Sequence, residues 1–275
     1  MSELRSRVKT AAVLLPVFVA AIVWLPTSVL AVILGAVVLL GAWEWAILAG
    51  FDAKPIRVAW VALTAAVMAL VAWKLNSPSL VNMLLGAALL WWAFALVAIA
   101  LYQSGRALIW PRGALALMLG WLIIIPPWLG IVILHRSELY GPGWVLCLLT
   151  IVWVADIGAY FCGRRFGKRK LASRVSPGKT VEGILGALVV GCALGLVGIL
   201  GLDWGPIWLV CVLVALTVLM SVLGDLAESV MKRQAGVKDS GSILPGHGGV
   251  LDRIDSLTAA VPFFVIFAHY LRSAS

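Results

Sequence analysis

The segment from Ser229 to Asp255 combines residue types that could hold a metal ion together with a polyphosphate. It contains three aspartates, four Lys or Arg residues, one histidine and five glycines, whereas the chain as a whole is 63% hydrophobic. Carboxylates suit Mg²⁺, cationic side chains suit phosphate oxygens, and glycines permit close approach of the backbone. Lipid does not tolerate such a segment, so we expect it at a membrane surface or in a hydrated cavity.

Carboxylates gather at two expected helix ends. Asp225 and Glu228 have i, i+3 spacing and share a helix face with Ser229, and Asp252 and Asp255 repeat this spacing before the last apolar run. A single carboxylate here would be interpreted as a helix cap. Several together repel one another and raise each other's pKa unless a cation neutralises them. The cluster therefore favours Mg²⁺, which retains open positions for substrate phosphates.

A second polar segment, residues 163–180, contains two basic patterns. The stretch Ser176–Thr180 (SPGKT) ends like a P-loop, but that motif needs a glycine where Ser173 stands, so we exclude it. The run GRRFGKRK, from Gly163 to Lys170, ends a membrane span and can also hold a phosphate or a lipid headgroup. These two roles are compatible.

Three further side chains have more than one interpretation. His247 has no partner histidine at metal-ligand spacing, which argues against zinc. It either donates a hydrogen bond to phosphate or has a structural role. Asp156 and Glu44 are carboxylates within apolar spans, where a charge costs about 2.5–3.5 kcal/mol. Asp156 precedes Arg164 by eight residues, near the cytoplasmic end of its span, so we rank it above Glu44, which we place at the membrane interface.

The overall composition is that of a polytopic membrane protein. A hydrophobic fraction of 63% exceeds the value of about 45–50% in soluble domains. A net charge of +9 would suggest nucleic acid for a soluble protein, but here it fits loops that face anionic lipids and substrates, so we expect no nucleic acid partner. The four cysteines form no C-x-x-C pair and are interpreted as small core residues.

Nine apolar runs approach the length of about 20 residues that a spanning helix needs. The first follows basic residues but no small-residue cleavage site follows it, so we interpret it as an uncleaved helix. With a cytoplasmic N-terminus, 18 of the 21 Lys and Arg residues fall on the cytoplasmic side, as positive residues prefer. The predicted spans are residues 10–26, 28–49, 56–73, 80–101, 114–134, 143–162, 181–202, 206–223 and 256–272.

We therefore predict an all-α polytopic membrane protein of about nine transmembrane helices with a cytoplasmic N-terminus. Residues 1–135 would form N-terminal helices that supply a scaffold and a lipid groove, and residues 136–275 a catalytic transmembrane part. The catalytic part carries two cytoplasmic polar loops, 163–180 and 224–255, which could build one joint site. Gly191 and Gly195 form a G-x-x-x-G pattern, a weak indication of a dimer.

The polar C-terminal segment resembles the signature of the phosphatidate cytidylyltransferases, also called CDP-diacylglycerol synthases. The matching elements are Ser229, Lys232-Arg233, Lys238-Asp239, Gly241, Pro245, His247-Gly248-Gly249 and Asp252-Arg253-Ile254-Asp255. The resemblance extends upstream through Asp156–Tyr160, Gly163–Lys168 and Ser176–Gly183. It covers about the C-terminal half, with Ala187 standing where a second glycine is expected. The first five spans match in hydropathy only.

The resemblance implies that CTP and phosphatidic acid react to give CDP-diacylglycerol and pyrophosphate. It also implies a homodimer in the bacterial cytoplasmic (inner) membrane, with a site that faces the cytoplasm and uses Mg²⁺, alone or with a second cation. Asp225, Asp252 and Asp255 match the metal ligands, and with Lys238 they are the expected catalytic residues. Expected substrate contacts are Asp156, Arg164, Lys168, Ser176, Lys179, Thr180, Ser229, Lys232, Arg233, Asp239, His247, Gly248, Gly249 and Arg253.

Other function classes fit parts of the pattern. A transporter is the first alternative, because many spans with intramembrane carboxylates also suit ion-coupled transport. Against it, the charged cluster lies in loops and no inverted repeat is visible. The second alternative is a related nucleotidyltransferase or lipid kinase that acts on another lipid, since acceptor choice depends on the apolar groove. A structural scaffold would not need the loop carboxylates.

Overall fold

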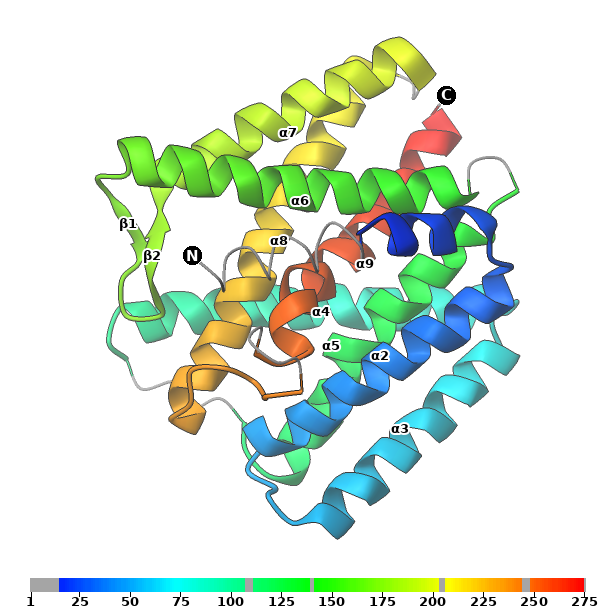
Figure 1. The fold of residues 1–275 in the computed structure, drawn as a ribbon, viewed down its shortest axis with the longest axis vertical. Coiled ribbons are helices and arrows are strands. Elements are labelled where there is room, and N and C mark those ends of the chain that lie inside the picture. Colours follow the sequence, from blue (N-terminus) through cyan, green and yellow to red (C-terminus); the bar gives the residue numbers. More distant parts are fainter. Residues whose placement is uncertain (1–14, 107–110, 139–140, 203–205, 244–247, 275) are drawn as a thin grey trace.

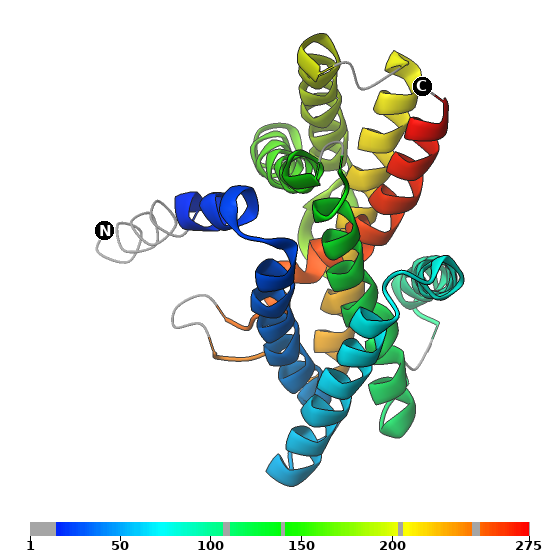
Figure 2. The same cartoon turned by 90° about the vertical axis from the view of Figure 1, so that its right-hand side faces the viewer.

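The computed structural model describes residues 15–106, 111–138, 141–202, 206–243 and 248–274 (Figures 1 and 2). This part of the chain is built from helices and one β-hairpin. In chain order the elements are a short helix at Leu15–Trp24, α2 (Thr27–Leu48), α3 (Lys54–Trp73), α4 (Pro78–Gln103), α5 (Ala114–His135), α6 (Gly141–Phe166), β1 (Lys170–Ala172), β2 (Ser176–Thr180), α7 (Val181–Leu202), α8 (Ile207–Ala235) and α9 (Leu251–Ala274).

The structure confirms the helical membrane fold. Six of the described helices, α2 to α6 and α8, are long and apolar enough to cross a membrane. The predicted loop at 224–255 was too long, because α8 continues to Ala235 and α9 begins at Leu251. The polar residues of α8 lie at helical spacing and therefore extend the helix instead of ending it. The helix stops at Gly236, whose φ of 73° is the left-handed conformation typical of a helix C-cap.

The other predicted loop, 163–180, contains a β-hairpin. Its strands pair antiparallel, with Lys170 opposite Thr180 and Ala172 opposite Ser176. The hairpin joins α6 to α7, which lie side by side, and stands at the left edge of Figure 1. The turn of the hairpin rests on the end of α4, where the backbone N–H of Arg174 donates to the side chain of Gln103 over 3.1 Å. The position of the hairpin is thus fixed by the two helices that it joins, α6 and α7, and by α4, which is distant in the sequence.

Glycines allow α7 to approach both of its neighbours. A Cβ at Gly183 would lie 2.9 Å from the carbonyl oxygen of Ala159 in α6, and one at Gly186 would collide with Cys162. Gly191 and Gly195 face Val214 of α8 in the same chain. The G-x-x-x-G pattern therefore packs helices within one molecule, and it no longer supports the prediction of a dimer.

The hydrophobic core joins the two predicted parts of the chain. Trp45 of α2 and Trp92 of α4 are buried in one cluster with Leu226 of α8 and Leu251 of α9. The indole of Trp45 also donates a hydrogen bond to the carbonyl of Ala116 in α5 over 2.9 Å. The N-terminal helices are therefore the wall against which the polar C-terminal segments fold.

Both polar segments lie at the same end of the helix bundle. Lys179 of the hairpin pairs with Asp225 of α8, and the side chain of Arg112, just before α5, donates to the backbone carbonyl of Gln234. At the other end of the bundle, His135 contacts Thr27 over 2.8 Å. A joint site built from the two polar segments is therefore geometrically possible.

Candidate active site

A cavity of about 440 Å³ lies between the C-terminal part of α6, strand β2, the start of α7, and α8. Three of these elements, α6, β2 and α8, contribute polar side chains to this cavity, although Asp156 and Asp225 are 69 positions apart in the sequence. Five of the residues that the sequence nominated line it: Asp156, Arg164, Lys179, Thr180 and Asp225. The structure thus brings together both polar segments and the intramembrane carboxylate of α6.

The start of α7 fixes the hairpin side of this cavity. The hydroxyl of Thr180 accepts a hydrogen bond from the backbone N–H of Gly183 over 3.1 Å, which makes Thr180 the N-cap of α7. The carboxylate of Glu182 accepts hydrogen bonds from the backbone N–H groups of Lys168 and Arg169 over 3.0 and 3.1 Å. Lys179, one residue before the cap, is thereby directed towards α8.

Lys179 forms an ion pair with Asp225, with 2.6 Å between the ammonium nitrogen and a carboxylate oxygen. The side chains remain 24% and 34% exposed, so water and ligands can reach both. The hydroxyl of Ser229 donates to the other oxygen of Asp225 over 3.3 Å. This pair is the only described ion pair that joins the hairpin to α8, and it stands in the wall of the cavity.

A second and more enclosed cluster lies further along α8. Lys232 contacts Asp252 of α9 over 2.5 Å and Glu228 over 3.3 Å. The side chains of these residues are at most 13% exposed. The other oxygen of Asp252 accepts hydrogen bonds from the backbone N–H groups of Ser240 and Gly249, over 3.0 and 2.8 Å. Both carboxylate oxygens of Asp252 are therefore occupied.

The first turn of α9, which precedes the apolar part of that helix, holds two aspartates in different environments. Burial opposes ionisation of Asp252, but the hydrogen bonds from Lys232 and Gly249 outweigh it and lower its pKa to about 2. For Asp255, burial of the carboxyl group and the nearby negative charge of Asp225 both raise the pKa. Asp225 of α8 and Asp255 of α9 are thus close enough for the charge of one to affect the ionisation of the other.

The remaining nominated residues, Asp252 and Asp255 among them, do not line this cavity. Ser176 is half-buried at the start of β2. Gly248 has a φ of 83°, which favours glycine, and the backbone N–H of Gly249 is already bonded to Asp252. His247 lies outside the described residues. The exposed residues are Lys168, Arg233, Lys238, Asp239 and Arg253.

Glu44 of α2, which the sequence analysis ranked below Asp156, is fully buried inside the protein. Its carboxylate accepts hydrogen bonds from the backbone N–H groups of Val250 and Leu251, over 3.0 and 2.9 Å, and from the hydroxyl of Ser240 over 3.2 Å. The sequence indicated that Glu44 has a specific partner, because an ionisable residue inside a membrane span needs one. It did not indicate which residues that partner comprises.

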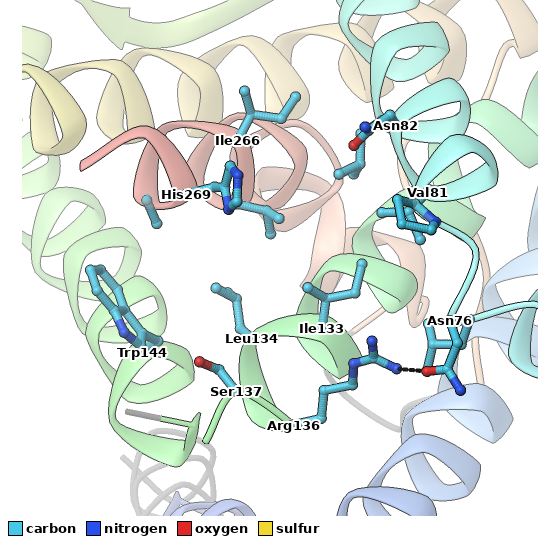
Figure 3. Close-up of a pocket in the computed structure, with 15 residues that line it drawn as sticks. Asn76, Val81, Asn82, Ile133, Leu134, Arg136, Ser137, Trp144, Ile266 and His269 are labelled. Atoms are coloured by element: carbon cyan, nitrogen blue, oxygen red, sulfur yellow. Dashed lines mark hydrogen bonds between the residues drawn. The ribbon is translucent and has the colours of Figure 1, made fainter. Parts of the chain in front are cut away.

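A second cavity, of about 340 Å³, opens at the opposite end of the bundle (Figure 3). Arg136 lies at its edge and donates a hydrogen bond to Asn76 over 3.0 Å. Most other lining side chains are apolar, among them Leu134, Trp144 and Ile266, and no described lining residue is a carboxylate or a lysine. This cavity has an arginine and a histidine, but its described lining includes no carboxylate for a metal ion. The cavity between α6 and α8 combines carboxylates with cationic side chains and is therefore the candidate active site.

The comparison with known proteins covers nearly the whole chain. Residues 5–271 match the cytidylyltransferase family. A phosphatidate cytidylyltransferase of Pseudomonas aeruginosa is 46% identical over 263 residues, which are 95% of each chain. One of Haemophilus influenzae is 38% identical over 290 residues, covering 98% of this chain and 99% of that one. The match includes the N-terminal helices, whose resemblance to the family had rested on hydropathy alone. This chain belongs to the cytidylyltransferase family.

Proposed function

We propose that this protein transfers the cytidylyl group of CTP to phosphatidic acid, giving CDP-diacylglycerol and pyrophosphate. The observation that carries the proposal is the cavity in which Arg164 and Lys179 meet Asp156 and Asp225. Cationic side chains suit phosphate oxygens, and the carboxylates suit a divalent cation. The relatives named above bear the name of this activity and align along nearly their whole length. We place the reaction at the cytoplasmic face of a bacterial inner membrane, where positive residues gather.

The surroundings of the cavity suit a lipid acceptor. Tyr160, which lines the cavity, Phe161 of α6, and Leu185 and Val189 of α7 expose 57–70% of their surface. Such side chains favour contact with acyl chains. A lipid can therefore keep its tails in the bilayer while its phosphate enters the cavity sideways, and CTP can enter from the polar end of the bundle, past the hairpin.

The reaction needs little proton chemistry. An anionic oxygen of the lipid phosphate attacks the α-phosphorus of CTP. The bond from that phosphorus to the bridging oxygen breaks, and pyrophosphate leaves with the electron pair. Positioning and charge stabilisation dominate reactions of this kind. Lys179 and Arg164 line the space in which the phosphates would meet, so we assign them to neutralising the triphosphate and the leaving pyrophosphate.

We further propose that the site uses Mg²⁺. Among the described residues, no three His, Cys, Asp or Glu side chains already form a metal-binding group. The donors fit nonetheless, because Asp225 and Asp255 approach each other from α8 and α9 and carboxylates are the ligands that Mg²⁺ prefers. Asp252 would join them after Lys232 releases one of its oxygens. The ion would supply positive charge to the triphosphate.

The test is an assay with CTP labelled at either end of its triphosphate. Purified protein is incubated with Mg²⁺ and phosphatidic acid, and the lipid and aqueous fractions are separated. We expect α-phosphate label in the lipid and γ-phosphate label in pyrophosphate, with both products lost in EDTA and restored by Mg²⁺. Transfer of the γ-phosphate label to lipid would instead reveal a lipid kinase. No labelled lipid, with uptake of CTP into vesicles, would reveal a transporter.

The acceptor is tested in the same assay. Isoprenoid phosphates and ether-lipid phosphates are offered in place of phosphatidic acid, at equal surface concentration in mixed micelles. We expect phosphatidic acid to give the highest kcat/KM. A higher value with one of the other lipids would keep the nucleotidyltransferase reaction and replace the acceptor in our proposal.

A further inference from the structure

We infer that Glu44 is a positioning residue for the reaction, because it anchors the loop that carries Asp252 to the N-terminal helices. This inference rests on the proposed function. Glu44 lies in the last two turns of α2, about 200 positions from its partners, and its side chain is fully buried. A buried carboxylate is costly unless donors satisfy it. Among the residues that the structure describes, Glu44 has three donors, and all of them belong to the segment 240–251.

The contacts of Glu44 lie at the N-terminal end of α9. The first backbone N–H groups of a helix have no partner within the helix, and a negative charge there interacts favourably with the helix dipole. Val250 and Leu251 supply two such N–H groups, one to each oxygen of Glu44. Glu44 therefore caps α9 from a different helix, and this fixes where the first turn of α9 stands.

Ser240 connects Glu44 to Asp252. Its hydroxyl donates to Glu44 over 3.2 Å, and its backbone N–H donates to Asp252 over 3.0 Å. The remaining oxygen of Asp252 contacts Lys232 of α8 over 2.5 Å. A chain of direct contacts thus leads from α2, through Ser240 and Asp252, to the charged face of α8. Displacing Glu44 would change the position of Asp252 without touching it.

The glycines of the segment match this carboxylate. A Cβ at Gly241 or at Gly249 would collide with Glu44, and one at Gly249 would also collide with the hydroxyl of Ser240. At these two positions, glycine therefore allows the backbone of the segment to lie close to a side chain of α2. The anchor is itself held in place, because the neighbouring Trp45 is buried and bonded to α5.

The test compares Glu44→Gln with a control of equal burial. The glutamine has the same shape, but its amide would present N–H groups to at least one of the three donors. We expect kcat/KM for CTP to fall about tenfold or more, and KM for the lipid to stay unchanged. Glu44→Asp, which keeps both acceptor oxygens, should recover part of the loss. Thr64→Val, which removes a fully buried hydroxyl from α3, is the control and should stay near wild-type activity.

Hydrogen exchange gives a readout that does not depend on turnover. In Glu44→Gln we expect faster exchange in the peptides that contain Val250 and Leu251, and unchanged exchange in α3 and α5. If Glu44→Gln does not fold, Ser240→Ala takes its place in the test. The alanine variant removes one of the three donors, and we expect its kcat/KM for CTP to fall about threefold. Wild-type kinetics with unchanged exchange in the variant that folds would overturn the inference, as would an equal loss in Thr64→Val. A wild-type protein that makes no CDP-lipid would overturn the proposed function instead, and the exchange result would still report on the anchor.

Discussion

The two sides of the candidate site are built differently. On the hairpin side, one ion pair between Lys179 and Asp225 spans the cavity wall, and both side chains remain 24–34% exposed. On the side of α8 and α9, Asp252 is bonded to Lys232 and to two backbone N–H groups, in a cluster whose charged side chains are at most 13% exposed. The first side can exchange partners with little loss of stability. On the second side, opening the enclosed pair between Lys232 and Asp252 costs more, and the two backbone hydrogen bonds keep Asp252 in place.

This difference suggests a division of labour. An exposed lysine paired with an aspartate can turn to a phosphate when the substrate enters, and it then leaves the aspartate free for a cation. Under the proposed function, the enclosed cluster would hold Asp252 in position for the triphosphate, which is the preorganisation that charge stabilisation requires. Variants that separate activity from stability test this division.

The largest expected effects are those of Asp225→Asn and Asp252→Asn. Each should lower kcat about 1,000-fold or more, because each removes a negative charge that we assign to the metal site. Their effects on stability should differ. Asp252→Asn breaks an enclosed ion pair, at a cost of about 3 kcal/mol, and should lower the Tm by several degrees. Asp225→Asn, at a half-exposed pair, should leave the Tm nearly unchanged.

The measurements are the CDP-lipid assay and thermal unfolding of the purified variants, with the folding of the solubilised protein checked by size-exclusion chromatography. Near-normal turnover in either folded variant would refute the metal assignment of that aspartate. Equal losses of Tm in both variants would show that the two sides of the site do not differ in the way that their exposure indicates.

A smaller effect is expected from Lys179→Ala. The side chain is exposed enough to reach a phosphate and stands in the cavity wall, so we expect kcat/KM for CTP to fall about 100-fold. The Tm should change little, since an exposed pair contributes about 0–1 kcal/mol. Lys179→Arg keeps the charge and should retain more activity than the alanine variant. If Lys179→Ala lowered Tm as much as Asp252→Asn, the hairpin side would contribute to stability as much as the enclosed cluster.

Much of this comparison could be predicted from the sequence, because the relevant signals are local. Apolar runs of about 20 residues predicted the first and last residues of α2 to α7 to within a few positions, since hydropathy and helix length are properties of the segment itself. The polar residues at helical spacing, including Asp225 and Ser229, were correctly placed near one another for the same reason.

What the sequence did not supply was long-range pairing. Glu44 and Val250 are separated by 206 positions, and no local pattern links them. The glycines at 241 and 249 were interpreted as sites of close approach to a ligand, and only the fold shows that Glu44 occupies that space. The end of α8 and the start of α9 fell within the predicted loop 224–255, because hydropathy marks only the apolar part of each helix and tertiary contacts keep the polar part helical.

The smallest effect among the variants that test this comparison is expected for Lys238, which follows the end of α8 and is exposed on the loop between the two sides. We expect Lys238→Ala to raise the apparent KM for CTP, or to lower kcat, by about tenfold, because a flexible cation contributes to phosphate binding without being fixed beforehand. The Tm should not change. Lys74→Ala, at an exposed lysine of the opposite end that rests on Trp73, is the matched control and should keep wild-type kinetics. An unchanged rate for Lys238→Ala at every CTP concentration would remove this residue from the site, and triphosphate binding would then be left to the cavity wall and the enclosed cluster. A loss as large as that of Lys179→Ala would instead make the loop a third element of the site.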